Sequence, residues 1–131
     1  DSVAKDLYVF YDYECPYCAA AFEHFRTAGF AARVHWLPVA ILGRSSAAYG
    51  AGVLDGVVPL KQIANTKVTQ YPRPSAISLY ALAHTTSLLK AMQKRASTPT
   101  FVYQTPTGRV LTLKGFNPTA SGALHKLLAS E

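Results

Sequence analysis

The chain contains two cysteines, Cys15 and Cys18, and they are separated only by Pro16 and Tyr17. Disulfide exchange needs a thiolate that attacks and a second thiol that resolves the mixed disulfide, and a C-x-x-C pair at the beginning of a helix supplies both. The unpaired N–H groups and the positive end of the helix dipole favour the anionic form of the first sulfur. We therefore expect Cys15 to be the nucleophile, with a lowered pKa, and the deeper Cys18 to be the resolving thiol.

The residues around the two cysteines should tune the redox chemistry. Pro16 removes one N–H donor that could otherwise bind the thiolate, whereas Tyr17 keeps its N–H and offers an aromatic surface to a substrate. Glu14 would act in the opposite direction, because a carboxylate that comes close to Cys15 disfavours the thiolate. No cofactor is expected beyond the redox-active Cys15–Cys18 disulfide itself.

A structural disulfide and a metal site are the other readings of the cysteine pair. A disulfide that closes so short a loop restricts the unfolded chain little, so it would stabilise the fold poorly. Two cysteines cannot form a four-cysteine zinc site. The four histidines lack the paired spacing of a mixed site; they are His24, His35, His84 and His125. We expect no bound metal.

The first 40 residues predict a β–α–β unit around the cysteines. Residues 7–11 favour a buried strand, and residues 17–26 favour a helix with Pro16 in its first turn and Gly29 placed to end it. Residues 33–39 alternate as a second strand that turns Val34, Trp36 and Leu37 inward. Such a unit implies two parallel strands with a right-handed crossover.

The remainder of the chain predicts helices followed by a hairpin. Residues 43–70 suggest short helices, and Ser75 can cap a helix over residues 76–95. The expected apolar face of that helix consists of Ile77, Leu82, Leu88, Leu89 and Met92. Strands follow at 100–104 and 109–114 around a turn at 106–108, and a last helix begins at Pro118 and carries Leu124, Leu127 and Leu128.

This order predicts a single α/β domain over residues 1–131, with a mixed four-stranded sheet flanked by helices and a helical insertion at about 43–97. Thr98-Pro99 directly precedes the third strand, where thioredoxin-like folds carry a cis-proline that faces the cysteines. A cis bond there would expose the backbone of Thr98 to pair with an extended substrate. The alternative is an ordinary trans proline that opens a strand.

The run from Val9 to Cys18 reads V-F-Y-D-Y-E-C-P-Y-C. It resembles the DsbC/DsbG family of periplasmic disulfide isomerases and reductases, and its C-P-Y-C form is most similar to DsbG. The resemblance implies a thioredoxin-like catalytic domain with Cys15 and Cys18 as the redox pair and Thr98-Pro99 as the substrate-facing loop. Asp12 matches the family's acidic position before the motif, where it would either tune the redox pair or make a local turn contact.

The resemblance also implies a periplasmic or secreted location. The partners would be protein or peptide thiols and disulfides, together with a redox partner protein. Nothing in the chain supplies the family's N-terminal dimerisation domain and linker helix, and the chain begins at Asp1 without an apolar leader. We therefore expect a monomeric catalytic domain, excised or mature. Whether it acts as an oxidase, a reductase or an isomerase stays open.

Two other functions compete with this reading. Glutaredoxins also use C-P-Y-C, so glutathione-dependent reduction is one. The other is a non-enzymatic peptide-binding or chaperone module that uses the groove beside Thr98. Its candidate contacts are Tyr11, Tyr13, Tyr17 and Tyr49, although packing in the core is the more ordinary role for these tyrosines.

Charge and hydropathy exclude two classes of partner. The net charge is +6, but the 13 basic residues are spread out, and a solvated helix face explains the densest group, Lys90, Lys94 and Arg95. Nucleic-acid binding usually needs a concentrated basic face. No apolar run approaches the ~18 residues that cross a bilayer. We expect neither nucleic-acid binding nor stable membrane insertion.

Overall fold

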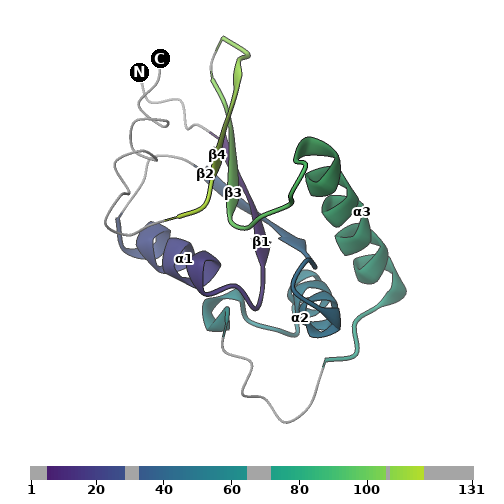
Figure 1. Ribbon diagram of the computed structural model, residues 1–131. Coiled ribbons are helices and arrows are strands. Elements are labelled where there is room, and N and C mark those ends of the chain that lie inside the picture. The colour runs from purple at the N-terminus through teal and green to yellow at the C-terminus, as the bar shows by residue number, and fades with distance from the viewer. Residues whose placement is uncertain (1–5, 29–32, 65–71, 106, 117–131) are drawn as a thin grey trace.

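The computed structural model describes residues 6–28, 33–64, 72–105 and 107–116. Within these residues the chain forms four strands, three α-helices and one short 3₁₀ helix (Figure 1). In chain order these are β1 (Asp6–Asp12), α1 (Pro16–Ala28), β2 (Arg33–Val39), α2 (Arg44–Leu54), η1 (Leu60–Gln62), α3 (Ala76–Met92), β3 (Thr100–Gln104) and β4 (Val110–Lys114). The predicted order of elements is confirmed over this part of the chain.

The four strands form one mixed sheet in the order β2-β1-β3-β4. β1 pairs in parallel with β2 and antiparallel with β3, and β3 pairs antiparallel with β4. Val9 lies opposite Trp36 on one side and Phe101 on the other, so β1 is a central strand. A central strand is covered on both faces, which explains why residues 7–11 are apolar or aromatic without polar alternation.

Helices cover the two faces of the sheet, with α1 on one side and α3 on the other (Figure 1). On the α1 side, Leu7 and Val9 pack with Ala21 of the helix and with Phe101. On the α3 side, Phe10, Val39 and Leu89 form a second cluster, against which Leu37 packs. The sheet therefore lies between two helical layers, as in α/β domains generally. Val34 and Trp36 face the α1 side, so the residues of β2 that turn inward do so on both faces.

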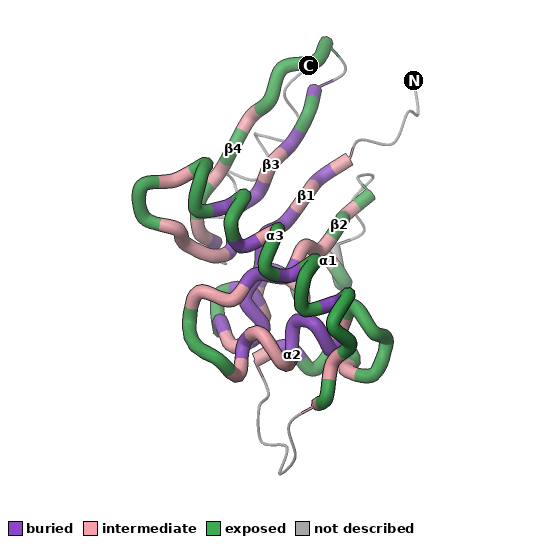
Figure 2. Tube along the Cα trace, turned by 90° about the vertical axis from the view of Figure 1, so that its right-hand side faces the viewer, coloured by how far each residue is buried: buried purple, intermediate pink, exposed green. Residues whose placement is uncertain are grey.

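Helix α3 is the element whose orientation differs most from the sequence-based expectation. Ser75 caps it as predicted, accepting a hydrogen bond from the Ser78 N–H at 3.2 Å, but the helix ends at Met92 rather than at residue 95. Leu82 and Leu89 are buried as expected. The prediction was wrong for the other three apolar residues, because Ile77, Leu88 and Met92 are exposed. In Figure 2 much of α3 is coloured as exposed.

Hydrogen bonds explain the orientation of α3. Its inner face contains the polar residues Ser78 and Thr86. The Ser78 hydroxyl donates to the Asp55 carboxylate at 2.6 Å, and the Ala40 N–H donates to Thr86 Oγ1 at 3.0 Å. Because these two hydroxyl residues face their hydrogen-bond partners, apolar residues on the opposite side of α3 face solvent.

Several predicted features lie outside the described residues: the helix stop at Gly29, the insertion over 65–70, Pro106 in the hairpin turn, and the last helix from Pro118 with Leu124, Leu127 and Leu128. Where the insertion is described, it consists of α2, η1 and α3 between β2 and β3. In the described part of the chain, no helix has the length and apolar character needed to cross a membrane.

Candidate active site

The cysteine pair lies where the central strand passes into the first helix. β1 ends at Asp12, and the Cys15 N–H donates to the Asp12 carbonyl at 3.0 Å in a tight turn. α1 then begins at Pro16, which needs no N–H partner at this position. The N–H groups of Cys18 and Ala19 both donate to the Cys15 carbonyl at 3.1 Å. Cys15 is therefore the residue that leads into the first helical turn, as the motif predicts.

Both cysteines are free thiols and are packed differently. Cys15 retains 5% of its surface exposed, while Cys18 has none. They belong to a buried cluster with Tyr11, Tyr13, Tyr49 and Ile63, which we call the cysteine cluster. The less exposed cysteine is the second one, in agreement with the predicted roles of attacking and resolving sulfur.

The two thiols have opposite pKa shifts. A hydrogen bond from the Cys18 thiol is the largest of several effects that together lower the pKa of Cys15 to about 6, although burial opposes them. The Thr98 side chain and the backbone at Cys18 and Tyr17 add further hydrogen bonds to the Cys15 thiolate. Burial raises the pKa of Cys18 strongly, and the neighbouring Cys15 charge raises it further. Near neutral pH the pair therefore holds one thiolate and one thiol.

The Thr98–Pro99 peptide bond is cis, as predicted, and the loop lies against the cysteines. The Cys15 thiol donates to the Thr98 carbonyl at 3.6 Å, across 83 residues of sequence. Thr98 is half-buried and Pro99 is fully buried. The sequence analysis used only the backbone of Thr98. The contribution of its side chain to the pKa of Cys15 was missed, and no local signal in the sequence could have revealed it.

Asp12 is fully buried and anchors the segment that follows β2. Its carboxylate accepts hydrogen bonds from the Ile41 N–H at 2.9 Å, the Leu42 N–H at 3.0 Å and the Ser46 hydroxyl at 2.6 Å. A fourth bond comes from the Glu14 N–H at 2.9 Å. Of the two roles considered for Asp12, this geometry corresponds to the turn contact, through the Glu14 N–H. The same carboxylate also binds the segment that follows β2.

The Glu14 carboxylate contacts serine side chains at the beginning of α2. It accepts a hydrogen bond from the Ser45 hydroxyl at 2.6 Å and lies 2.8 Å from the Ser46 hydroxyl, whose one proton it shares with Asp12. The hydrogen bonds to Cys15 lower its pKa against the opposing effect of burial. The sequence analysis did not single out either serine, because both lie in an Ala-, Gly- and Ser-rich segment without a motif.

The candidate peptide-contacting tyrosines are mostly core residues. Tyr11, Tyr13 and Tyr49 are at most 3% exposed, so they pack in the core, which is the more ordinary of the two roles considered for them. The rings of Tyr13 and Tyr49 stack at 5.2 Å, and the Tyr13 hydroxyl donates to the Pro59 carbonyl at 3.1 Å. Of these four tyrosines only Tyr17, between the cysteines, is open to solvent, with 62% of its surface exposed.

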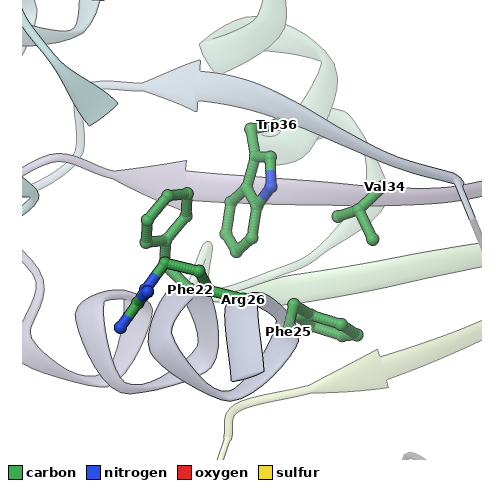
Figure 3. A pocket seen from close by; sticks show the side chains of 5 residues that line it. All are labelled: Phe22, Phe25, Arg26, Val34 and Trp36. Atoms are coloured by element: carbon green, nitrogen blue, oxygen red, sulfur yellow. The ribbon is translucent and has the colours of Figure 1, made fainter. Parts of the chain in front are cut away.

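A pocket of about 230 Å³ lies between α1 and β2 (Figure 3). Phe22, Phe25 and Arg26 line it from α1, and Val34 and Trp36 line it from β2. Its lining contains no nucleophile or acid–base pair, so it does not compete with the cysteine pair as a reaction centre. Among the residues that the structure describes, no three or more His, Cys, Asp or Glu side chains gather as a metal site.

Comparison with solved structures decides the fold. ScsC of Proteus mirabilis in a compact conformation matches with a TM-score of 0.67 and 21% identity, covering 95% of this chain and 84% of that one. A periplasmic thioredoxin-like protein from Salmonella enterica serovar Typhimurium matches with a TM-score of 0.58 and 20% identity over 96% and 85% of the two chains. The chain has a thioredoxin-like fold.

A thioredoxin-like oxidoreductase from Silicibacter pomeroyi DSS-3 has the same fold, with a TM-score of 0.60 and 18% identity over 97% of this chain and 88% of its own. No protein-family model matches the sequence, and no curated protein matches it. The predicted fold class is thus confirmed by structure, while the resemblance to DsbG rests on the short motif around Cys15 and stays a prediction.

Proposed function

We propose that this chain is a thiol–disulfide oxidoreductase that exchanges electrons with disulfides or oxidised cysteines of protein or peptide substrates. The observation that carries the proposal is the pair of free thiols with opposite pKa shifts at the beginning of α1, packed against the cis Thr98–Pro99 loop. A buried structural thiol has no need for a lowered pKa, whereas a nucleophile that works at neutral pH does.

The reaction would run through a mixed disulfide. The Cys15 thiolate attacks one sulfur of the substrate disulfide; a Cys15–substrate S–S bond forms, and the other substrate sulfur leaves as a thiolate and is protonated. Cys18 then loses its proton and attacks Cys15. The mixed disulfide breaks, the Cys15–Cys18 disulfide forms, and the second substrate sulfur leaves with the proton. Two electrons pass from the cysteine pair to the substrate, and the reverse sequence oxidises a dithiol.

Two features support a protein or peptide as substrate. Thr98 borders the attacking sulfur and is half-buried, so its backbone is placed to pair with an extended chain. Tyr17 offers an exposed aromatic ring between the two cysteines. A small thiol such as glutathione would use less of this surface. The pair itself would be the only redox group, and a second redox protein would restore it after each turnover.

The proposed cellular location and the proposed type of oxidoreductase rest on similarity to other proteins. One solved neighbour is described as periplasmic, and an oxidising compartment suits an enzyme that handles disulfides. Together with the DsbC/DsbG-like motif, this supports a periplasmic enzyme. The isomerase, reductase and oxidase directions differ in the reduction potential of the pair.

Trapping of the mixed disulfide tests the proposal. Cys18→Ser should accumulate a covalent complex with a disulfide-containing peptide, because Cys15 can attack but nothing resolves the intermediate. Cys15→Ser should form no complex. Equal or absent trapping in both variants would overturn the enzyme reading. Peptide binding that survives Cys15→Ser without exchange would favour the binding module, and turnover that strictly requires glutathione would favour the glutaredoxin-like alternative.

A further inference from the structure

The Tyr11 hydroxyl is a buried polar group without a hydrogen-bond partner in the described part of the chain. The side chain lies near the end of β1 and is fully buried. A phenylalanine would fill the same space without that hydroxyl. Since an unpaired buried hydroxyl disfavours folding, an orphan of this kind calls for a partner that appears in another state of the protein.

Tyr11 belongs to the cysteine cluster, together with Cys15 and Cys18. An edge-to-face contact with Trp36, with ring centroids 5.9 Å apart, holds its ring. Burial raises the pKa of Tyr11, and the charges of Tyr13, Cys18 and Asp12 raise it further. The phenol is therefore a proton donor at any ordinary pH, and it lies within electrostatic reach of the resolving sulfur.

The other polar groups near Tyr11 are already engaged. The Tyr13 hydroxyl donates to the Pro59 carbonyl, and the Asp12 carboxylate accepts four hydrogen bonds. In the reduced protein the Cys18 thiol donates a hydrogen bond to the Cys15 thiolate. That interaction ends when Cys15 becomes bonded to a substrate sulfur, because the charge on Cys15 disappears. Cys18 must then become an anion inside the cluster.

We propose that the Tyr11 hydroxyl donates a hydrogen bond to the Cys18 thiolate during resolution of the mixed disulfide. The inference rests on the proposed function and adds a residue to it. No proton leaves the phenol: the Cys18 proton goes to the departing substrate sulfur, the Cys18–Cys15 bond forms, and the Cys15–substrate bond breaks. The Thr98 side chain and the Asp12 backbone also offer hydrogen bonds to Cys18, so Tyr11 would share the anion with them.

Tyr11→Phe tests the proposal because it removes only the hydroxyl. Attack by Cys15 on a peptide disulfide should keep its rate, while resolution by Cys18 should slow about tenfold, as expected for the loss of a hydrogen bond to a charged group. The pH profile of resolution should move to higher pH by about one unit. Rapid-quench separation of the mixed disulfide measures both steps.

Tyr103→Phe is the matched control. Tyr103 is as buried as Tyr11 but lies in the neighbouring core cluster, which contains no cysteine. Its substitution should leave unchanged the ratio of the rates of attack and resolution, and also the pH profile of resolution. Equal resolution rates and pH profiles for wild type and Tyr11→Phe would overturn the proposal, and so would an equal effect of Tyr103→Phe.

A second measurement does not depend on exchange activity. In a Cys15→Ser background Cys18 carries the only cysteine thiol, and because burial raises its pKa strongly, its alkylation rate below that pKa is proportional to the small thiolate fraction. Adding Tyr11→Phe should lower this rate about tenfold at each pH, the equivalent of one pKa unit. An unchanged rate overturns the role of Tyr11. If the lowered rate is found but the wild type forms no mixed disulfide, the proposed function fails while the Tyr11–Cys18 interaction stands.

Discussion

Cys15 and Cys18 are three positions apart, yet their sulfur atoms meet different environments. Cys15 lies just before α1, where a thiol, a side chain and backbone groups can all donate to its anion. Cys18 lies within the first turns of the helix and is closed off from solvent by the cysteine cluster. The difference between the proposed nucleophile and the proposed resolving thiol therefore arises from their positions along one helix.

Thr98→Val should raise the pKa of Cys15, because it removes a side-chain hydrogen bond to the thiolate while keeping the shape of the residue. The expected rise is about one unit, the equivalent of one hydrogen bond to a charged group. The rate of Cys15 alkylation against pH measures it in a Cys18→Ser background, where the Cys18 contribution is equally absent from both proteins. Thr98→Ser keeps the hydroxyl and should stay close to the parent, so a shift as large as that of valine would contradict this role.

At the residue scale, sequence reasoning found what local motifs encode. The cysteine pair, Pro16 at the first helical position and the cis bond before Pro99 all follow from short patterns. Ser45 and Ser46 could not be found, because they reach Asp12 and Glu14 from more than 30 residues away. The orphan hydroxyl of Tyr11 likewise exists only once the strand and the helix are packed together.

At the element scale, Asp12 joins the end of β1 to the segment that leads into α2. Asp12→Asn should destabilise the protein by about 2–4 kcal/mol, because the amide cannot accept from all four donors and places its own N–H₂ against them. Denaturant unfolding measures the loss. Asp6→Asn, on the exposed ion pair with Arg33, should cost much less. Equal losses in the two variants would show that Asp12 is no anchor.

Helix α3 provides a paired test of its observed orientation. Leu82→Ala should lower the free energy of unfolding by about 2–5 kcal/mol, because a buried leucine leaves a cavity. Ile77→Ala should change it by no more than about 0.5 kcal/mol, because Ile77 is 82% exposed. Urea unfolding of both variants measures the contrast. A large loss at Ile77 would restore the orientation expected from the sequence.

The elements themselves were largely predictable. The bounds of β2 and β3 agree with the sequence pattern, because alternating or apolar runs are bounded by clear turn residues. The inner face of α3 was not predictable, since apolar residues surround the helix and two buried hydroxyls decide its rotation. Hydrophobic periodicity carries little information when polar residues point inward to distant partners.

At the scale of the whole molecule, the lowered pKa of Cys15 makes stability depend on pH. The folded reduced protein releases the Cys15 proton near pH 6, whereas the unfolded chain releases it near about 8.5. Stability should therefore rise by about 3 kcal/mol between these values, and the gain is lost as the pH falls through 6. Above about pH 8.5 the raised pKa of Cys18 lowers the stability of the folded protein. Cys18 then ionises in the unfolded chain but stays a thiol in the folded one.

Denaturant unfolding of the reduced protein at several pH values between 5 and 8.5 measures this dependence. The oxidised protein and Cys15→Ser both lack the titrating Cys15 thiol, so each should show a flatter profile. A reduced protein that is equally stable at pH 5 and pH 8 would show that Cys15 holds no stabilised thiolate.

The reduction potential of the Cys15–Cys18 pair in a glutathione redox buffer tests the central claim most directly. The account predicts a reversible two-electron couple. A Cys15 pKa of about 6 lies between those of thioredoxin, about 7, and of the most oxidising C-x-x-C proteins, about 3.5. The potential should accordingly lie between about −270 and −120 mV, and its place in that range separates reductase from oxidase or isomerase. A pair that gives no reversible couple would contradict the assignment of this chain as a thiol–disulfide oxidoreductase.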